Sequence, residues 1–336
     1  MDLIITVDTE ADNQWRRPSP TTTENVRFIP RFQALCDRFG FRPTYLAGYL
    51  AANDAEFRNV ICPYQESGRA EIGAHLHPWT TPPVDRSVEG GERHHPFPHE
   101  LPGDLLEAKL ATLTGAVEKA AGRAPTSYRA GRFGFAGLQI APLLSAGYVV
   151  DCSVTPYVSH AHLSGLPGGR GGPDFRAARP GAYYPDCDDC TRPGQSSLLE
   201  VPVTILFTRW PSRSWRACQA WQVRGAGRPA NRLIGRLGHG PRWLRPWRNT
   251  RAAGLIRIYR AAQTLDLPCV EMMLHSSELM PGGSPEFPDQ PAVEKLYGVL
   301  DKTFAFMAAD GCRSVTLTQF ARSFSGSQEK GGPSRY

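Results

Sequence analysis

The stretch Leu3–Glu10 (LIITVDTE) decides how the chain folds, because it joins a buried strand to a pair of acidic side chains. Residues 3–7 are apolar, largely β-branched and bounded by carboxylates, which is typical of a buried strand rather than of a helix. Asp8 and Glu10 are two residues apart, so on an extended backbone both side chains point to the same face. We therefore expect a core strand that presents two carboxylates at its carboxyl end.

Strand-like and helix-like stretches alternate along the rest of the chain. We expect helices at 24–39, 55–61, 105–121, 137–146, 252–265 and 293–309, and strands at 43–49, 71–75, 127–130, 148–152, 198–207 and 269–274, with a further short candidate at 314–317. This alternation predicts a parallel α/β architecture, either doubly wound or closed into a barrel. Two long connections, 78–103 and 159–197, interrupt it, and connections of that length in a compact domain are usually functional.

The composition is that of a globular protein, with 336 residues of which 41% are hydrophobic and 21% charged. No apolar run is long enough for an ordinary membrane-spanning helix. The chain starts without a basic leader or a small-residue cleavage site, so we expect a cytoplasmic protein. Its 8 cysteines are scattered, which favours free thiols over a disulfide framework. The single CxxC, Cys187 and Cys190, is more typical of a structural loop than of a zinc site.

The net charge of +6 hides a strongly basic segment at 201–265, which holds thirteen Arg and no Lys, Asp or Glu. The rest of the chain carries 25 basic and 32 acidic residues, a net charge of −7. Five of the seven Trp also lie in this Arg/Trp block: Trp210, Trp215, Trp221, Trp243 and Trp247. Arg and Trp together suit a membrane interface or an anionic glycan, such as a lipid- or nucleotide-linked sugar. The alternative is a solvated insertion whose Trp pack on the barrel; nucleic acid is disfavoured because no recognition motif accompanies the arginines.

Reactive side chains follow the predicted strands, at the end where parallel α/β domains bind their ligands. They are Asp8, Glu10, His75, His77, Arg129, Arg132, Asp151 and His275. One carboxylate with two imidazoles is a common ligand set for a divalent metal that keeps positions open for water and substrate. The second carboxylate would then be free to act as a general base, with His275 as the proton donor.

Four segments, in this order, resemble the polysaccharide deacetylases of the NodB-homology type, and among them the WalW-like subgroup: 6–10 (TVDTE), 71–78 (EIGAHLHP), 128–134 (YRAGRFG) and 274–276 (LHS). The similarity runs from Asp2 to about Phe320. It implies an α/β fold, an irregular (β/α) barrel of about seven parallel strands. We expect one catalytic barrel at 1–322, with the Arg- and Trp-rich insertion at about 208–251 and a flexible tail at 323–336.

The resemblance also implies roles for single residues. Asp8 matches the catalytic base, Arg129 the arginine that orients it, and His275 the general acid. Glu10 matches the carboxylate metal ligand, where the family more often has Asp, and His75 matches the first imidazole ligand.

The second imidazole departs from the family pattern. The family places it four positions after the first, where this chain has Trp79, so we predict His77, with His94, His95 and His99 as alternatives. Asp151 and Asp174 are left without an assigned role.

The resemblance implies a metal-dependent hydrolase, with Zn²⁺ as the expected cofactor, that removes an acetyl group from an N-acetylated amino sugar in a glycan or glycolipid precursor. One alternative is an inactive barrel that binds a carbohydrate or a membrane surface. Another is a metal-dependent hydrolase of a different amide. The predicted catalytic and metal residues all lie outside 201–265. We therefore expect the block to serve substrate docking or peripheral contact with the inner face of the membrane rather than the chemistry.

Overall fold

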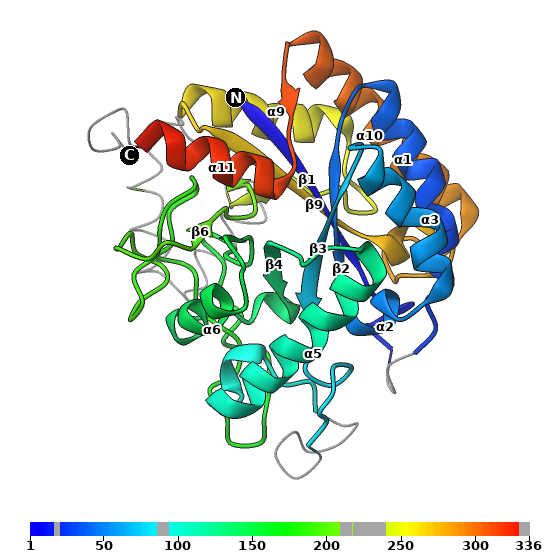
Figure 1. Cartoon of the computed structure of the whole chain (residues 1–336). Helices are drawn as coiled ribbons and strands as arrows, with labels where there is room; N and C mark the ends of the chain where they lie inside the picture. The colour runs from blue at the N-terminus through cyan, green and yellow to red at the C-terminus, as the bar shows by residue number, and fades with distance from the viewer. Residues whose placement is uncertain (17–20, 86–93, 209–216, 218–239, 329–336) are drawn as a thin grey trace.

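Eight parallel strands form one curved sheet at the centre of the molecule (Figure 1). The computed structural model describes residues 1–16, 21–85, 94–208, 217 and 240–328. Seven strands follow the spatial order β9-β1-β2-β3-β4-β5-β6, and the short β10 pairs with the first residues of β1. The strands are β1 (Asp2–Thr9), β2 (Pro43–Ala47), β3 (Glu71–Leu76), β4 (Ser127–Ala130), β5 (Val150–Asp151), β6 (Leu199–Glu200), β9 (Cys269–His275) and β10 (Arg313–Ser314). The seven-strand run curls into a half-barrel, which confirms the predicted α/β barrel.

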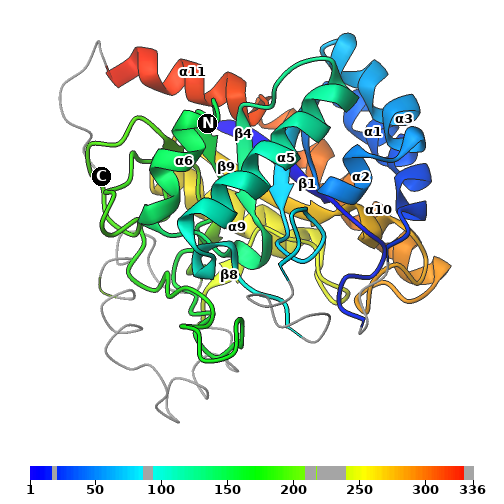
Figure 2. The same cartoon turned by 60° about the horizontal axis from the view of Figure 1, so that its bottom comes forward.

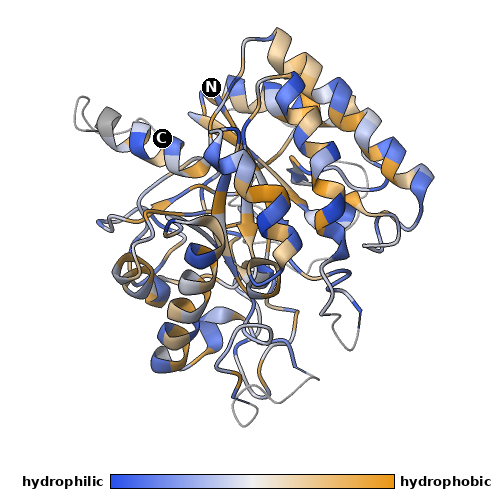
Figure 3. Cartoon of the chain, turned by 45° about the vertical axis from the view of Figure 1, so that its right-hand side comes forward, coloured by the Kyte–Doolittle hydropathy of each residue, from blue (hydrophilic) through white to orange (hydrophobic). Residues whose placement is uncertain are grey.

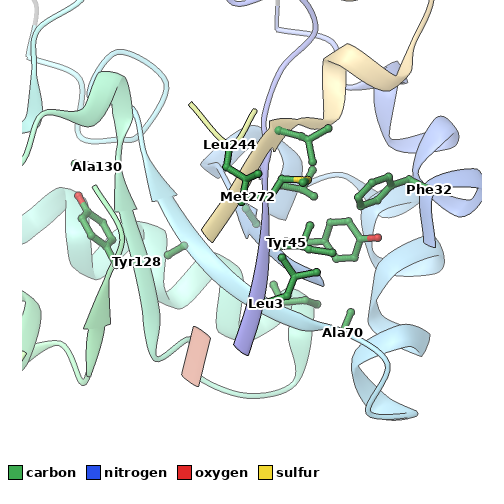
Figure 4. Close-up of a cluster of buried hydrophobic side chains, with 14 of the residues drawn as sticks. Leu3, Phe32, Tyr45, Ala70, Tyr128, Ala130, Leu244 and Met272 are labelled. Atoms are coloured by element: carbon green, nitrogen blue, oxygen red, sulfur yellow. The ribbon is translucent and has the colours of Figure 1, made fainter. Parts of the chain in front are cut away.

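The strand β1 lies in the middle of the sheet, and all of its residues are buried. Leu3, Ile5 and Val7 belong to the larger hydrophobic cluster, whereas Ile4 belongs to a second cluster. The strand β1 therefore has buried apolar side chains on both faces, as expected of a parallel strand covered on both sides. Figure 4 shows Leu3 with Tyr45 and other members of the larger cluster, which also contains Phe32 of the first helix.

Helices surround the sheet: α1 (Ile29–Arg38), α2 (Tyr49–Ala52), α3 (Ala55–Glu66), α5 (Gly103–Ala121), α6 (Ile140–Ser145), α9 (Ala252–Thr264), α10 (Gln290–Ala309) and α11 (Leu317–Gln328). In Figure 3 the central strands are largely hydrophobic, whereas the helices alternate hydrophobic and hydrophilic residues. That pattern is typical of helices with one face on the core. Among the described residues, no helix is long and apolar enough to cross a membrane.

The helix α11 covers the amino-terminal end of the sheet (Figures 1 and 2). The Leu317 N–H donates to Thr44 Oγ1 at 3.1 Å, and the Thr318 N–H donates to Glu71 Oε2 at 3.0 Å, where β2 and β3 begin. Phe320 packs in the second hydrophobic cluster beside Ile4. This end of the barrel is therefore closed, and the carboxyl end remains for a site. The helix continues to Gln328, past residue 323, where we predicted the tail to begin; residues 329–336 lie outside the described residues.

The prediction of one strand over 198–207 is wrong, because the structure has two short strands there. The first, β6, pairs with β5, whereas β7 (Ile205–Leu206) pairs antiparallel with β8 (Arg242–Trp243). Pro202 between them has no N–H to donate to a sheet, which favours a break at this point. The chain then crosses toward β9, where the Thr204 N–H donates to Glu271 O at 3.2 Å. Residues 209–216 and 218–239 of the predicted insertion lie outside the described residues.

Candidate metal centre and active site

A cavity of about 550 Å³ lies at the carboxyl end of the sheet, and all six predicted site residues line it: Asp8, Glu10, His75, His77, Arg129 and His275. The strand register brings them together. Asp8 on β1 lies opposite His275 on β9, and His75 on β3 lies opposite Arg129 on β4. Parallel strands in register end at one rim, so side chains at their carboxyl ends share one space.

Glu10, His75 and His77 form the one group of potential metal ligands found among the described residues. Their ligand atoms lie within 4.8 Å of one another, and all three side chains are buried. Glu10 Oε2 is 2.5 Å from His77 Nε2 and 3.4 Å from His75 Nε2. His75 Nδ1 lies 3.1 Å from the Arg129 carbonyl, which can only accept, so the proton sits on Nδ1 and leaves Nε2 free to coordinate.

The charge states of two of these three groups, Glu10 and His77, suit a divalent cation. Burial opposes ionisation of Glu10, but His77 and His75 outweigh it and hold the pKa of Glu10 well below its ordinary value. Burial lowers the pKa of His77 and so favours the neutral ring. Burial also opposes protonation of His75, but Asp8 and Glu10 overcome it and raise the pKa of that imidazole. An ionised carboxylate and neutral imidazoles are the forms that coordinate metals, so Glu10 and His77 are already in that form.

A glycine makes room for the His77 ring. A Cβ on Gly131 would lie 2.4 Å from His77 Nδ1 and 2.5 Å from Leu76 O, closer than real Cβ atoms approach. We had not predicted a role for this position. The signal was the glycine directly after a strand that carries Arg129, since an isolated Gly at a strand end often marks a close approach.

Of the alternatives to His77, His95 also lines the cavity, but it does not belong to the group of potential metal ligands. Trp79, at the position where the family has its second histidine, packs between His77 and His95, with ring centroids 4.4 Å and 4.0 Å away. His99 lies 3.1 Å from the Gly171 carbonyl through its Nε2. Neither His94 nor His99 lines the cavity. Within the described residues, His77 is therefore the candidate that groups with Glu10 and His75.

Arg129 is fully buried between two carboxylates. It lies 2.6 Å from Asp8 Oδ1 and 2.7 Å from Glu271 Oε1. Burial raises the pKa of Asp8, but Arg129, with His75 and His275, more than offsets this and holds that pKa below its ordinary value. For Glu271 burial dominates, so its pKa is raised. Asp8 is therefore an ionised carboxylate at neutral pH and is suited to accept a proton.

Glu271 was missed from the sequence. Its side chain also accepts a hydrogen bond from the Thr6 hydroxyl, so it connects β1, β4 and β9 beneath the cavity. The available signal was a single acidic residue inside the apolar strand 269–274, four positions before His275 and therefore on the same face.

His275 is held by the Arg/Trp block. Arg245 Nη2 lies 3.0 Å from His275 Nδ1 and 2.5 Å from Glu278 Oε1, and both Arg245 and Glu278 are buried. Because a guanidinium can only donate, His275 Nδ1 accepts and the ring carries its proton on Nε2. That Nε2 lies 3.8 Å from Asp8 Oδ2, on the cavity side. The block therefore reaches the cavity through Arg245, beside His275.

The two unassigned carboxylates lie outside the cavity. Asp151 is fully buried and accepts hydrogen bonds from the backbone and hydroxyl of Ser153. Asp174 forms an ion pair with Arg176. Neither lines the cavity, so neither takes part in the site described here. Of the CxxC pair, Cys187 is exposed and Cys190 is buried, and neither belongs to the metal-ligand group.

Solved structures with the same fold include polysaccharide deacetylases. The sequence itself matches no protein-family model and no curated protein. A candidate polysaccharide deacetylase from Mycobacterium smegmatis superposes with a TM-score of 0.54 at 15% identity, covering 100% of this chain and 94% of that one. A candidate glycoside hydrolase/deacetylase from Parabacteroides distasonis gives 0.60 at 13% identity, covering 96% and 70%. The PuuE allantoinase gives 0.52 at 13% identity, covering 97% and 90%. The chain therefore has the fold of the polysaccharide deacetylases, with a candidate metal site at the carboxyl end of its parallel sheet.

Proposed function

We propose that the protein is a metal-dependent hydrolase that removes the acetyl group from an N-acetylated amino sugar in a glycan or glycolipid precursor. The observation that carries the proposal is the shared cavity. It places the Glu10, His75 and His77 group beside an Asp8 held ionised by Arg129 and a His275 whose protonated Nε2 faces inward. A metal group, a base and an acid within one cavity match the needs of amide hydrolysis.

Glu10, His75 and His77 would hold the cation, and we propose Zn²⁺ because one carboxylate with two imidazoles is a common catalytic ligand set for it. When bound, the cation supplies Lewis acidity toward the acetyl carbonyl and toward the attacking water. Asp8 accepts the proton of that water at its carboxylate, and Arg129 keeps this carboxylate ionised and oriented. His275 gives its Nε2 proton to the departing amine and regains a proton at Nε2 from Asp8, whose Oδ2 lies 3.8 Å away, so the proton taken from the water ends on the amine and His275 stays neutral.

Aromatic side chains on the cavity wall would bind the sugar. Trp15, Phe133, Trp243 and Trp247 line the cavity, and Trp15 packs edge-to-face on His275 with ring centroids 5.1 Å apart. Amphipathic aromatic rings of this kind supply large contact area in ligand pockets, while a few polar groups orient the ligand.

The finer assignments also belong to this proposal. The sequence resemblance supports a WalW-like deacetylase. We also propose a cytoplasmic location. The charge of the Arg/Trp block supports a lipid- or nucleotide-linked sugar and peripheral contact with the inner face of the membrane.

Hydrolysis of an amide other than acetyl is the second candidate, because the allantoinase of the same fold acts on a different kind of substrate. An inactive carbohydrate- or membrane-binding barrel is the third. An acetate-release assay on N-acetylhexosamine oligosaccharides, together with elemental analysis of the purified protein, separates the three. A metal-loaded protein that releases no acetate but cleaves cyclic amides would favour the second, and a protein without either activity the third.

The sharpest test pairs two substitutions. Asp8→Asn should reduce the rate of acetate release by at least about a thousandfold, because it removes the proton acceptor while bound metal stays stoichiometric. His75→Ala should lose the metal itself. Full activity in Asp8→Asn would overturn the assignment of the base. Unchanged metal content in His75→Ala would overturn the ligand set.

A further inference from the structure

A second cavity of about 440 Å³ borders the first one, and the two share Trp243 and Trp247 as a common wall. The two indole rings meet edge-to-face with centroids 6.2 Å apart. The guanidinium of the buried Arg245 lies over the Trp247 ring at 4.1 Å, so the wall is braced by the same arginine that holds His275. A ligand that fills the catalytic cavity and extends past these rings would enter the second one.

The second cavity is cationic. Arg242 on β8 and Arg251 and Arg257 at the start of α9 line it, and no Asp or Glu is among its lining residues. All three arginines are exposed, and within the described part of the chain none of them has a carboxylate at ion-pair distance. Elsewhere, several described arginines do have such a partner, including Arg31 and Arg38. Three guanidinium groups around one hollow repel one another unless an anion lies between them.

The start of α9 adds to the same potential. The helix has thirteen residues and no side-chain cap at its N-cap residue Arg251, and both Arg251 and Gly254 of its first turn line the cavity. A helix N-terminus carries partial positive charge and offers N–H donors to anions. Guanidinium groups bind phosphate and carboxylate oxygens in a bidentate manner, and Arg is the side chain best matched to both.

From this we infer that the second cavity is a substrate subsite for an oxyanion, a phosphate or a carboxylate, attached to a saccharide whose N-acetylated sugar occupies the catalytic cavity. The inference rests on the proposed function for the identity of that neighbouring sugar. It goes beyond it by assigning a charged substrate and three specificity residues, Arg242, Arg251 and Arg257.

The first test measures binding without catalysis. The probes are glucose 1-phosphate, methyl glucuronide and the neutral methyl glucoside, titrated by calorimetry at low salt into the full-length protein. The triple variant Arg242→Gln/Arg251→Gln/Arg257→Gln should bind the anionic probe at least about 10-fold more weakly than wild type. The control variant Arg27→Gln/Arg123→Gln/Arg260→Gln removes the same charge from exposed arginines outside the cavity and should bind like wild type.

The outcomes are distinct. Binding of glucose 1-phosphate that the triple variant alone loses supports the subsite with phosphate as its ligand. The same pattern with methyl glucuronide supports it with a carboxylate. If neither anion binds wild type, or if the triple and control variants weaken equally, the subsite is overturned. None of these binding results depends on acetate release. The subsite can therefore be overturned while the deacetylase proposal stands, and the deacetylase proposal can be overturned while the subsite stands.

The second test measures specificity. In the triple variant, KM for acetate release from UDP-N-acetylglucosamine or a hyaluronan tetrasaccharide should rise about 10-fold or more, with kcat little changed. KM for the neutral N-acetylchitotetraose should stay within about twofold, because it places no charge in the subsite. An equal rise in KM for charged and neutral substrates would overturn the specificity role of these arginines.

Discussion

Two buried arginines, one from the core sheet and one from the Arg/Trp block, control the two acid–base groups of the cavity in different ways. Arg129 on β4 binds two carboxylates, Asp8 and Glu271, and so stabilises negative charge on Asp8. Arg245 binds one carboxylate, Glu278, and donates to the neutral acceptor nitrogen of His275. The first arginine therefore sets an ionisation state, and the second sets which ring nitrogen carries the proton.

Within the Arg/Trp block, buried and exposed arginines have different surroundings. Arg245 is buried and paired with Glu278, so it contributes no unbalanced charge to the cavity. Arg242, Arg251 and Arg257 are exposed around the neighbouring cavity, and no carboxylate is among the described residues that line it. Paired arginine fixes geometry, whereas unpaired arginine attracts an anion. The block thus combines a positioning residue with a candidate binding surface.

Removing Arg129 should produce the largest change in stability. Arg129→Met would leave Asp8 and Glu271 buried together without their cation, and breaking a buried pair in this way costs about 3–5 kcal/mol in the free energy of unfolding. Urea denaturation at pH 7 measures the effect. Arg129→Lys is the matched control, because it keeps the charge but loses the two-sided contact, and it should lose less. Equal stability of wild type and Arg129→Met would show that the two carboxylates do not depend on this arginine.

Glu278 gives the corresponding test on the side of the Arg/Trp block, with a smaller effect that depends on pH. Burial raises the pKa of Glu278, but Arg245, together with the His275 backbone N–H that donates to Glu278 Oε2 at 3.0 Å, outweighs it and lowers that pKa from 4.5 to about 2. A pKa that is lower in the folded state stabilises the fold above the unfolded value, and this contribution is lost as pH falls through the folded value. The difference of about 2.5 pKa units corresponds to about 3 kcal/mol at pH 7.

Glu278→Gln should therefore be less stable than wild type at neutral pH, and the gap should narrow as the pH drops from 4.5 toward 2. Urea denaturation of both proteins across this range measures the gap. The surface substitution Glu294→Gln is the control, since the pair that Glu294 forms with Arg31 is exposed and worth little. A gap that stays constant with pH would show that ionised Glu278 is not what stabilises the fold here.

Much of the fold and of the candidate site could be predicted from sequence because both depend on local patterns. Apolar strands marked the sheet, and strand ends marked Asp8, Glu10, His75, Arg129 and His275, which parallel pairing necessarily brings to one rim. The predicted strand at 198–207 was too long because apolar residues continue past Pro202. Hydrophobic periodicity does not show where a chain leaves one sheet and joins another.

The residues that were missed depend on contacts between distant parts of the chain. Arg245 is one of thirteen arginines in the block. Only the fold brings it into contact with Glu278, which lies 33 positions later in the sequence. Glu271 accepts a hydrogen bond from Arg129, although the two residues are 142 positions apart in the sequence. No local pattern encodes such partners, although an acidic residue in an otherwise apolar strand indicates that a buried cation must neutralise it.

The smallest predicted effect tests the metal side of the comparison, where a glycine rather than an arginine sets the geometry. In Gly131→Ala the new Cβ would meet His77 Nδ1 at 2.4 Å, so the ring must leave its observed position relative to Glu10 and His75. Displacing a ligand in this manner should weaken metal binding by about 10-fold, as supporting changes around metal sites commonly do. Competition with a chelator measures the affinity directly.

Gly115→Ala is the matched control, because an added Cβ at Gly115 on α5 has nothing within 4 Å. It should leave metal affinity unchanged and raise the free energy of unfolding by about 0.5–1 kcal/mol, since alanine favours a helix interior. If Gly131→Ala binds metal as tightly as Gly115→Ala, His77 does not need its observed position. The second imidazole ligand would then have to come from elsewhere, with His95, which stacks on Trp79 and lines the cavity, the first residue to test.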